Sequence, residues 1–255
     1  YALLIGFMYG DSNPFLAGLI MALLYFGALV VGAVAAGVIS LFVKEKSGAR
    51  LLMELPYYRR PRFSVIFLQA FMKAKSFIIK AGPIIFILAL VLWFATNFPR
   101  PEPVEGVAVS ESTVIAQNSY AAQAGKFIEP IFKPMGVDWR VGFALISAFA
   151  AREVFVSALV LMFNVQGDDE DTQVQGLLEA MRSATFEDGT LIFTTASIVG
   201  MLIFFMIALQ CASTVGILKK EMGSWKYAIG HLVLSNIAAY GLAVIAVVIL
   251  KAAGL

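Results

Sequence analysis

Two charged residues, Arg152 and Glu153, interrupt the apolar stretch 141–163. Placing a charge at the centre of a membrane helix costs at least about 2.5 kcal/mol, so some interaction must compensate it. Adjacent residues point in different directions on a helix, whereas Glu153 shares a face with Ser157, four residues on. Glu153 is therefore either an oxygen ligand for a cation in transit or half of an ion pair with another helix. We favour a structural role for Arg152, because its positive charge would repel a cation.

A second polar group closes the apolar stretch 191–218. It places an amide, a thiol and two hydroxyls within one and a half helical turns, at Gln210, Cys211, Ser213 and Thr214. Divalent transition-metal ions of borderline softness accept thiolate and oxygen ligands together. However, a membrane cysteine is commonly a small inert apolar residue, and serine and threonine hydroxyls commonly bond back to their own helix. The candidate metal-contacting residues are thus Glu153, Ser157, Cys211, Ser213 and Thr214.

The remaining polar residues and motifs indicate neither catalysis nor phosphate binding. A polar strip on the last apolar stretch contains His231, Ser235, Asn236 and Tyr240, and interfacial or interhelical hydrogen bonds account for it. The 255 residues contain neither a phosphate-binding G-x-x-x-x-G-K-[ST] motif nor a catalytic Ser/His/Asp grouping. We therefore expect these residues to carry no enzyme activity and to bind no nucleic acid.

The composition places these groups in lipid. Hydrophobic residues make up 60% of the chain and charged residues only 14%, with a mean hydropathy of +0.85; a soluble domain has about 25% charged residues. A single cysteine excludes an internal disulfide. Crossing a bilayer takes about 20 apolar residues in a helix. The sequence predicts an all-α, polytopic transmembrane bundle of about five spans, at residues 15–43, 77–98, 141–163, 191–218 and 227–250.

The loops between these spans differ in charge. Residues 44–62 contain six basic residues and two acidic ones, which predicts a cytoplasmic loop. Residues 63–76 are expected to form an amphipathic helix at the membrane interface, with Phe63, Phe67 and Phe71 facing inward. We expect two further loops that are richer in acidic than in basic residues, an external one at 99–138 and another at 167–190. The short segment 219–226 is basic again.

The charge rule and the number of spans disagree. If both basic loops are cytoplasmic, an odd number of crossings must separate them beyond the span at 77–98, yet the sequence offers two, 141–163 and 191–218. Either one of these is re-entrant or broken, or the segment 219–226 departs from the rule. Broken helices at membrane depth occur where they line a protein-walled or aqueous cavity. This conflict indicates 141–218 as the transport-active region.

Several motifs resemble the ferrous iron transport protein family FeoB, in the family's order and over nearly the whole chain. Residues 53–61, followed by Lys80-Ala81-Gly82, look like E-L-P-x-Y-R-x-P and K-A-G. Residues 136–142 are similar to G-x-D-W-R-x-G, and residues 151–154 to A-[KR]-E-V. Residues 211–214 and 221–226 resemble C-x-A-T and E-x-G-S-W-K. Together these matches are specific, although each alone would be weak.

The resemblance implies a bacterial inner-membrane permease for Fe²⁺, coupled to a cytoplasmic G domain that these residues do not contain; GTP would bind only there. It divides the chain into first membrane helices (1–98, with a basic cytoplasmic loop at 44–76), an external loop (99–138), a second Gate repeat (139–218), and a last basic loop and membrane helix (219–255). It also implies that Cys211 touches iron, with Glu153 as its companion.

The implied partners are the lipid bilayer, the protein's own N-terminal G domain and first Gate repeat, small cytoplasmic Feo proteins and a second copy of the chain. The chain begins without methionine or a signal peptide, so we expect it to start within a membrane segment. One departure is Gln210, where the family commonly has proline. The alternatives are a transporter of another solute, similar to nucleoside transporters, and a membrane scaffold that transports nothing.

Overall fold

The computed structural model describes residues 1–9, 13–42, 62–99, 119–149, 152, 154–165, 167, 169–186, 188–209 and 211–254. In these ranges the regular structure is helical apart from one isolated β-bridge, between Thr185 and Leu191. This confirms the all-α helical bundle. Its helices are α1 (Ala2–Tyr9), α2 (Pro14–Phe42), α3 (Phe63–Asn97), α5 (Tyr120–Phe132), the 3₁₀ helix η1 (Lys133–Met135), α6 (Trp139–Ser147), α7 (Val154–Met162), α8 (Glu170–Ser183), α9 (Thr195–Ile207), α10 (Ala212–Met222) and α11 (Trp225–Ala252).

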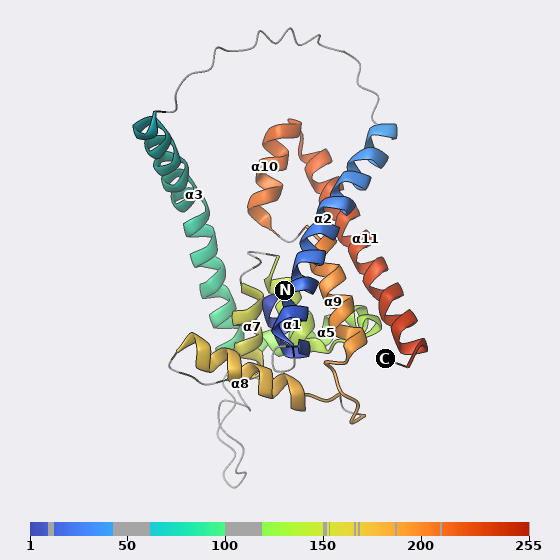
Figure 1. Cartoon of the computed structure of the whole chain (residues 1–255). Helices are drawn as coiled ribbons and strands as arrows, with labels where there is room; N and C mark the ends of the chain where they lie inside the picture. The colour runs from blue at the N-terminus through green and yellow to red at the C-terminus, as the bar shows by residue number, and fades with distance from the viewer. Residues whose placement is uncertain are drawn as a thin grey trace.

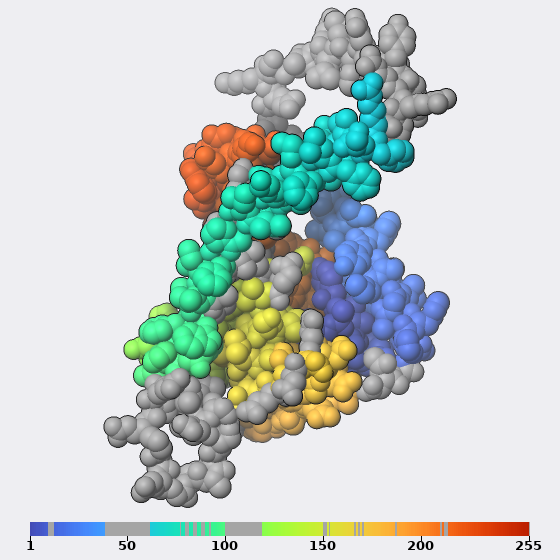
Figure 2. Space-filling view, turned by 90° about the vertical axis from the view of Figure 1, so that its left-hand side faces the viewer, coloured from blue at the N-terminus to red at the C-terminus, as the bar shows by residue number. Residues whose placement is uncertain are grey.

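Long helices connect the two ends of the bundle (Figure 1). Within the described ranges, Pro14–Val38 and Trp225–Ala252 are each long and apolar enough to cross a membrane. Helix α3 has 35 residues, which corresponds to a length of about 52 Å at 1.5 Å per residue. Its main helix contact is with α5, at its lower end. Figure 2 shows α3 as a ridge across one face of the molecule, reaching down to the level of α7 and α8.

The separate interfacial helix predicted at 63–76 is wrong. These residues continue without a break into the following span, because neither glycine nor proline separates the two segments. The aromatic side chains of the predicted inward face lie on the surface of the protein. Phe63, Phe67 and Phe71 are 70%, 73% and 67% exposed, respectively.

The apolar stretch 141–163 folds as a helical hairpin. Helices α6 and α7 have nine residues each, so each is only about 13 Å long, against a bilayer core of about 30 Å. The Arg140 guanidinium, at the start of α6, lies 4.5 Å from the ring centre of Phe163, just after α7. Phe143 and Met162 also pack in one cluster. These contacts require the chain to double back between the two helices, at residues 148–153.

The apolar stretch 191–218 is interrupted but continues in one general direction. Helix α9 ends at Ile207, Ala208 and Cys211 have extended backbones, and α10 begins at Ala212. Figure 1 shows α9 in the lower half of the bundle and α10 in the upper half. Gln210 itself lies outside the described residues. The helix therefore breaks in a chain that lacks the proline commonly found there.

These two interruptions remove the disagreement between charge and span number. Helices α5, before the hairpin, and α8, after it, both lie in the lower half of the bundle (Figure 1). The turn between α10 and α11 lies at the upper end, as do the end of α2 and the start of α3, which flank the first basic segment. The hairpin therefore returns to the end from which it came, and both basic segments adjoin the same end.

Much of the segment predicted as an external loop, 99–138, is helical. Ser119 caps α5 by accepting a hydrogen bond from the Ala122 amide, at 3.2 Å. The amphipathic α5 then buries Ala121, Ala122 and Gly125. The sequence did not indicate this helix because the apolar face of α5 spans only three helical turns and carries mainly small residues.

The acidic segment 167–190 also contains a helix, α8. Acidic residues in its first turn and Arg182 in its last turn both favour the helix dipole. Leu177 and Met181 anchor it in the core. In the turn beyond it, hydrogen bonds from the hydroxyl and the amide of Thr190 lower the pKa of Asp188. Charge alone therefore gave a wrong prediction of a loop.

Helices α9 and α11 form the most extensive helix pair. Gly200 allows this close approach, because a Cβ atom there would lie 2.5 Å from Val247 Cγ2 and 3.5 Å from the Ala243 carbonyl oxygen. Ala239 and Ala243 are fully buried on the same side of α11. In lipid, small residues of this kind let helix backbones pack by van der Waals contact.

This packing predicts that Gly200→Ala destabilises the protein, whereas Gly241→Ala does not. Overpacking a well-filled interface costs about 1–3 kcal/mol, while a Cβ at Gly241 meets nothing within 4 Å. The measurement is the midpoint of thermal unfolding of the purified protein in detergent. Equal midpoints for the two variants would contradict the close approach of α9 and α11.

Candidate functional site

The tip of the α6–α7 hairpin packs against α9 just below the break. The ring centres of Phe155 and Phe205 lie 4.7 Å apart with an interplanar angle of 73°, an edge-to-face contact. The Arg152 guanidinium lies 5.7 Å from the same Phe205 ring. Phe205 precedes the last residue of α9, Ile207, by two positions. The start of α7 and the nearby Arg152 therefore contact α9 within one turn of the point where α9 ends.

Arg152 interacts with aromatic rings. Its guanidinium lies 5.3 Å from the ring centre of Tyr1, and its Nη2 donates a hydrogen bond to the Tyr1 hydroxyl at 3.3 Å. Together with Phe155 and Phe205, these residues line a cavity of about 300 Å³. Cation–π contacts stabilise a guanidinium that has left bulk water. They agree with a structural role for this arginine.

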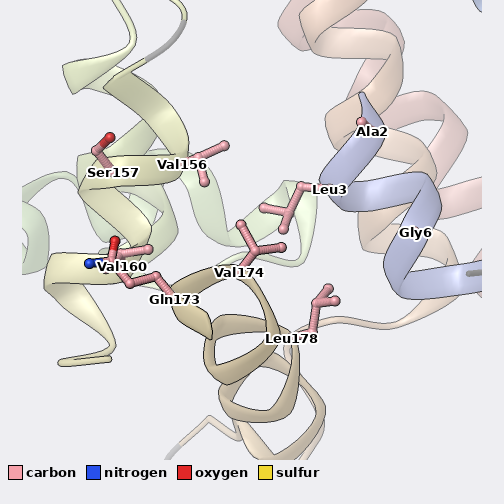
Figure 3. Close-up of a pocket in the computed structure, with 9 residues that line it drawn as sticks. All are labelled: Ala2, Leu3, Gly6, Val156, Ser157, Val160, Gln173, Val174 and Leu178. Carbon is pink, nitrogen blue, oxygen red and sulfur yellow. The ribbon is translucent and has the colours of Figure 1, made fainter. Parts of the chain in front are cut away.

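The other predicted site residues of this segment lie apart or are not described. Glu153 lies outside the described residues. Ser157 is exposed and lies at the edge of a second cavity, of about 460 Å³, between α1, α7 and α8 (Figure 3). Figure 3 shows Leu3, Val156 and Val174 around the middle of this mainly apolar space.

Cys211 occupies the N-cap position of α10 and is half-buried. Its carbonyl oxygen accepts hydrogen bonds from the amides of Thr214 and Val215, at 3.0 and 3.3 Å. Thr214 is also half-buried, whereas the side chain of Ser213 lies outside the described part of the structure. The break thus brings together a thiol, a hydroxyl one turn away and the carbonyl end of α9. Unwound carbonyls and helix C-termini are the groups that coordinate cations in discontinuous membrane helices.

Two residues of the polar strip of α11, Asn236 and Tyr240, donate hydrogen bonds to segments outside their own helix. The Asn236 amide nitrogen donates to the Leu209 carbonyl in the break at 3.1 Å, and to Leu232 of its own helix at 2.9 Å. The Tyr240 hydroxyl donates to the Ile131 carbonyl near the end of α5, at 2.6 Å. Helix α11 is therefore tied both to the break and to the helix that precedes the hairpin.

Asp138 organises the entry into the hairpin. Its Oδ1 accepts a hydrogen bond from the Val141 amide at 3.1 Å, and its Oδ2 pairs with Arg140 Nε at 2.5 Å. The Asp138 side chain is buried, so both interactions are shielded from water. Trp139 packs against Gly125 of α5, where a Cβ would lie 2.9 Å from the indole ring. The G-x-D-W-R-x-G motif thus joins α5 to α6.

Dense clusters of metal-binding side chains are absent from the described ranges. There, no three His, Cys, Asp or Glu side chains gather in an arrangement that could hold a metal ion. The candidate site is defined instead by where the chain leaves the helical conformation.

Two family models match the chain, and their order follows the helices described above. The model described as "Ferrous iron transport protein B C terminus" matches residues 21–73, and the Gate model, "Nucleoside recognition", matches residues 78–225. The second match contains both the hairpin and the α9–α10 break. The chain belongs to the FeoB family.

The FeoB relatives agree with this assignment. The "Fe(2+) transporter FeoB" of Leptospira interrogans (strain Fiocruz L1-130) is 34% identical over 231 residues, covering 88% of this chain and 32% of the relative. Its Campylobacter jejuni counterpart is 30% identical over 232 residues, covering 89% of this chain and 36% of the relative. A Porphyromonas gingivalis "Fe(2+) transport protein A/Fe(2+) transporter FeoB fusion protein" is 28% identical over 261 residues, covering 92% and 30%, respectively. The chain thus spans about a third of these relatives' length. No solved structure matches it.

The positioning roles of Asp138 and Arg140 in this FeoB site were not predicted from the sequence. Asp138 and Arg140 entered only as letters of a motif, although an aspartate directly before a helix is a recognisable N-cap signal. Asn236 was part of the polar strip for which interfacial or interhelical hydrogen bonds were expected. No sequence signal showed that its partner would be the Leu209 carbonyl, because the break itself was only one of several alternatives.

The geometry of Asp138 predicts a graded loss of stability. Asp138→Ala removes both the cap and the ion pair and should lower the free energy of unfolding by about 1–3 kcal/mol. Asp138→Asn keeps a capping oxygen and should lose less than half as much. Thermal unfolding of the purified variants in detergent measures both, and a fully stable Asp138→Ala variant would contradict this role.

Proposed function

We propose that this chain forms the ion-conducting part of a bacterial inner-membrane permease that imports Fe²⁺. The observation that carries the proposal is the contact between the hairpin tip and the α9–α10 break through Phe205. Interrupted helices at membrane depth expose main-chain polar groups, which lipid does not tolerate unless they line a protein-walled or aqueous path. The names of the relatives, all Fe²⁺ transporters, support iron as the cargo.

In this proposal Fe²⁺ meets mixed ligands as it passes the break. Glu153 would supply a carboxylate and Cys211 sulfur, as suits an ion of borderline softness. Thr214 and Ser213 supply hydroxyls from the first turn of α10, and Ser157 lies further along α7. The guanidinium of Arg152 remains engaged with Tyr1 and Phe205.

The proposed orientation follows from charge. The upper end in Figure 1 adjoins both basic segments, 44–62 and 219–226, and is placed in the cytoplasm by the positive-inside rule. The lower end, with α8, then faces the periplasm, and the protein crosses the inner membrane several times. The hairpin would enter from the periplasmic side and stop within the membrane.

The proposed partners lie partly in the cytoplasm and partly in the membrane. A G domain and a first Gate repeat of the same protein would complete the permease, with GTP bound only in the G domain. The Porphyromonas gingivalis relative is named as a fusion with Fe²⁺ transport protein A. This supports a small cytoplasmic Feo protein as a further partner of this chain. A second copy of the chain would pack in the membrane.

A nucleoside-type solute is the second candidate cargo. The description of the matching Gate model, "Nucleoside recognition", favours it. The cavity beside Arg152, lined by Tyr1, Tyr25, Phe155 and Phe205, also contains aromatic rings on which a base could stack. Competition between nucleosides and iron uptake in proteoliposomes separates the two candidates, because an iron permease is expected to be insensitive to nucleosides.

For the full-length protein, Glu153→Gln is expected to lower Fe²⁺ uptake by at least about tenfold. Removing a carboxylate that binds the ion, or that pairs with another charge within the membrane, should cost at least about 1.4 kcal/mol, which corresponds to a tenfold change. Cys211→Ser should be milder, because the hydroxyl keeps the shape and a weak oxygen ligand. The measurement is initial Fe²⁺ uptake into proteoliposomes.

Glu179→Gln is the matched control, because this exposed glutamate lies on α8, outside the candidate site. Each variant is first checked for insertion and for monodisperse purification. If Glu153→Gln and Cys211→Ser both fold and transport Fe²⁺ at the parent rate, neither residue carries the ion.

A further inference from the structure

The Leu209 carbonyl needs a hydrogen-bond partner because α9 stops short of it. In a continuous helix this oxygen would accept from the amide four residues on, at position 213. Here α9 ends at Ile207, and the first amide bonds of α10 go to the Cys211 carbonyl instead. A main-chain carbonyl left without a partner in lipid is strongly unfavourable.

Asn236 supplies the missing donor from another helix. Its amide nitrogen lies 3.1 Å from the Leu209 carbonyl oxygen and 2.9 Å from that of Leu232. A side-chain amide has two N–H donors, so one group can serve both carbonyls. Leucine at this position would provide a side chain of similar branching and no donor, and a hydroxyl would provide only one donor.

The rest of α11 holds this amide in register with the break. Gly200 of α9 meets Val247 of α11, and Leu209 meets Asn236. From the first contact to the second, the residue number rises by nine on the α9 side and falls by eleven on α11. The two segments therefore run antiparallel past Leu209. The hydrogen bond to Leu209 is therefore a continuation of the α9–α11 packing beyond the end of α9.

We infer that Asn236 is a positioning residue. Its hydrogen bond to Leu209 keeps α9 from continuing into α10, so that Cys211 stays at the N-cap of α10. Its link to ion passage rests on the proposed function, whereas its effect on the break does not. The chain offers a matched control in the adjacent Ser235, whose hydroxyl donates to the same Leu232 carbonyl, at 3.1 Å. Ser235→Ala thus removes a polar group of α11 and leaves the bond to Leu209 intact.

The test is the rate at which a membrane-permeant maleimide alkylates Cys211. It is measured in the full-length protein in proteoliposomes, with any other cysteine replaced by serine. We expect Asn236→Leu to be alkylated at least about threefold faster than Ser235→Ala, because the segment before Cys211 loses its tether. Asn236→Ala provides the same comparison if the leucine variant does not insert. A rate within twofold of Ser235→Ala, or slower, would overturn the inference.

Gly200→Ala separates local positioning from general loosening. It disturbs the α9–α11 interface nine residues from Leu209 but keeps the Asn236 side chain, so it should accelerate Cys211 alkylation less than Asn236→Leu does. Equal acceleration in Gly200→Ala and Asn236→Leu would also overturn the inference. Fe²⁺ uptake by the parent protein is measured in the same vesicles. Its absence would contradict the proposed function, while the alkylation rates would still decide the role of Asn236.

Discussion

Main-chain hydrogen bonding in lipid is the constraint on which this structure depends. Every peptide group inside a bilayer needs a partner, and a regular helix provides one automatically. The helices of this chain end twice within its apolar stretches, α6 at Ser147 before α7 begins at Val154, and α9 at Ile207 before α10 begins at Ala212. Each interruption must be compensated by groups from elsewhere in the fold, and those groups determine how the helices are arranged.

At the α9–α10 break a hydrogen-bond donor comes from α11, and α5 supports the hairpin by packing. Helix α11 packs tightly on α9 through Gly200, then donates from Asn236 into the break and from Tyr240 to the end of α5. Helix α5 in turn packs on α6 through Trp139 and Gly125, and so supports the hairpin. The hairpin tip returns to α9 at Phe205. The two interruptions are thus held in one connected framework, which is what a fixed ion path would require.

The sequence predicted where this framework would be, but not its form. Composition and span length predicted the helical membrane bundle, and the charge conflict identified 141–218 as unusual. The stretches 141–163 and 191–218 are both long and apolar, so hydropathy cannot tell which one turns back. That depends on long-range contacts such as Arg140 with Phe163. Helices α5 and α8 were missed because short amphipathic or acidic helices resemble loops in composition. Glu153, a central residue of the predicted site, lies outside the described residues.

The central claim is that 141–163 turns back, whereas 191–218 continues to the other side. Single cysteines introduced by Ser112→Cys, Asp171→Cys and Glu221→Cys in a Cys211→Ser background would test it. Position 112 precedes the hairpin, position 171 follows it in α8, and position 221 follows the break in α10. A membrane-impermeant maleimide applied to intact spheroplasts should label positions 112 and 171, and should label position 221 only after permeabilisation. Labelling of 112 and 171 from opposite sides of the membrane would contradict the account.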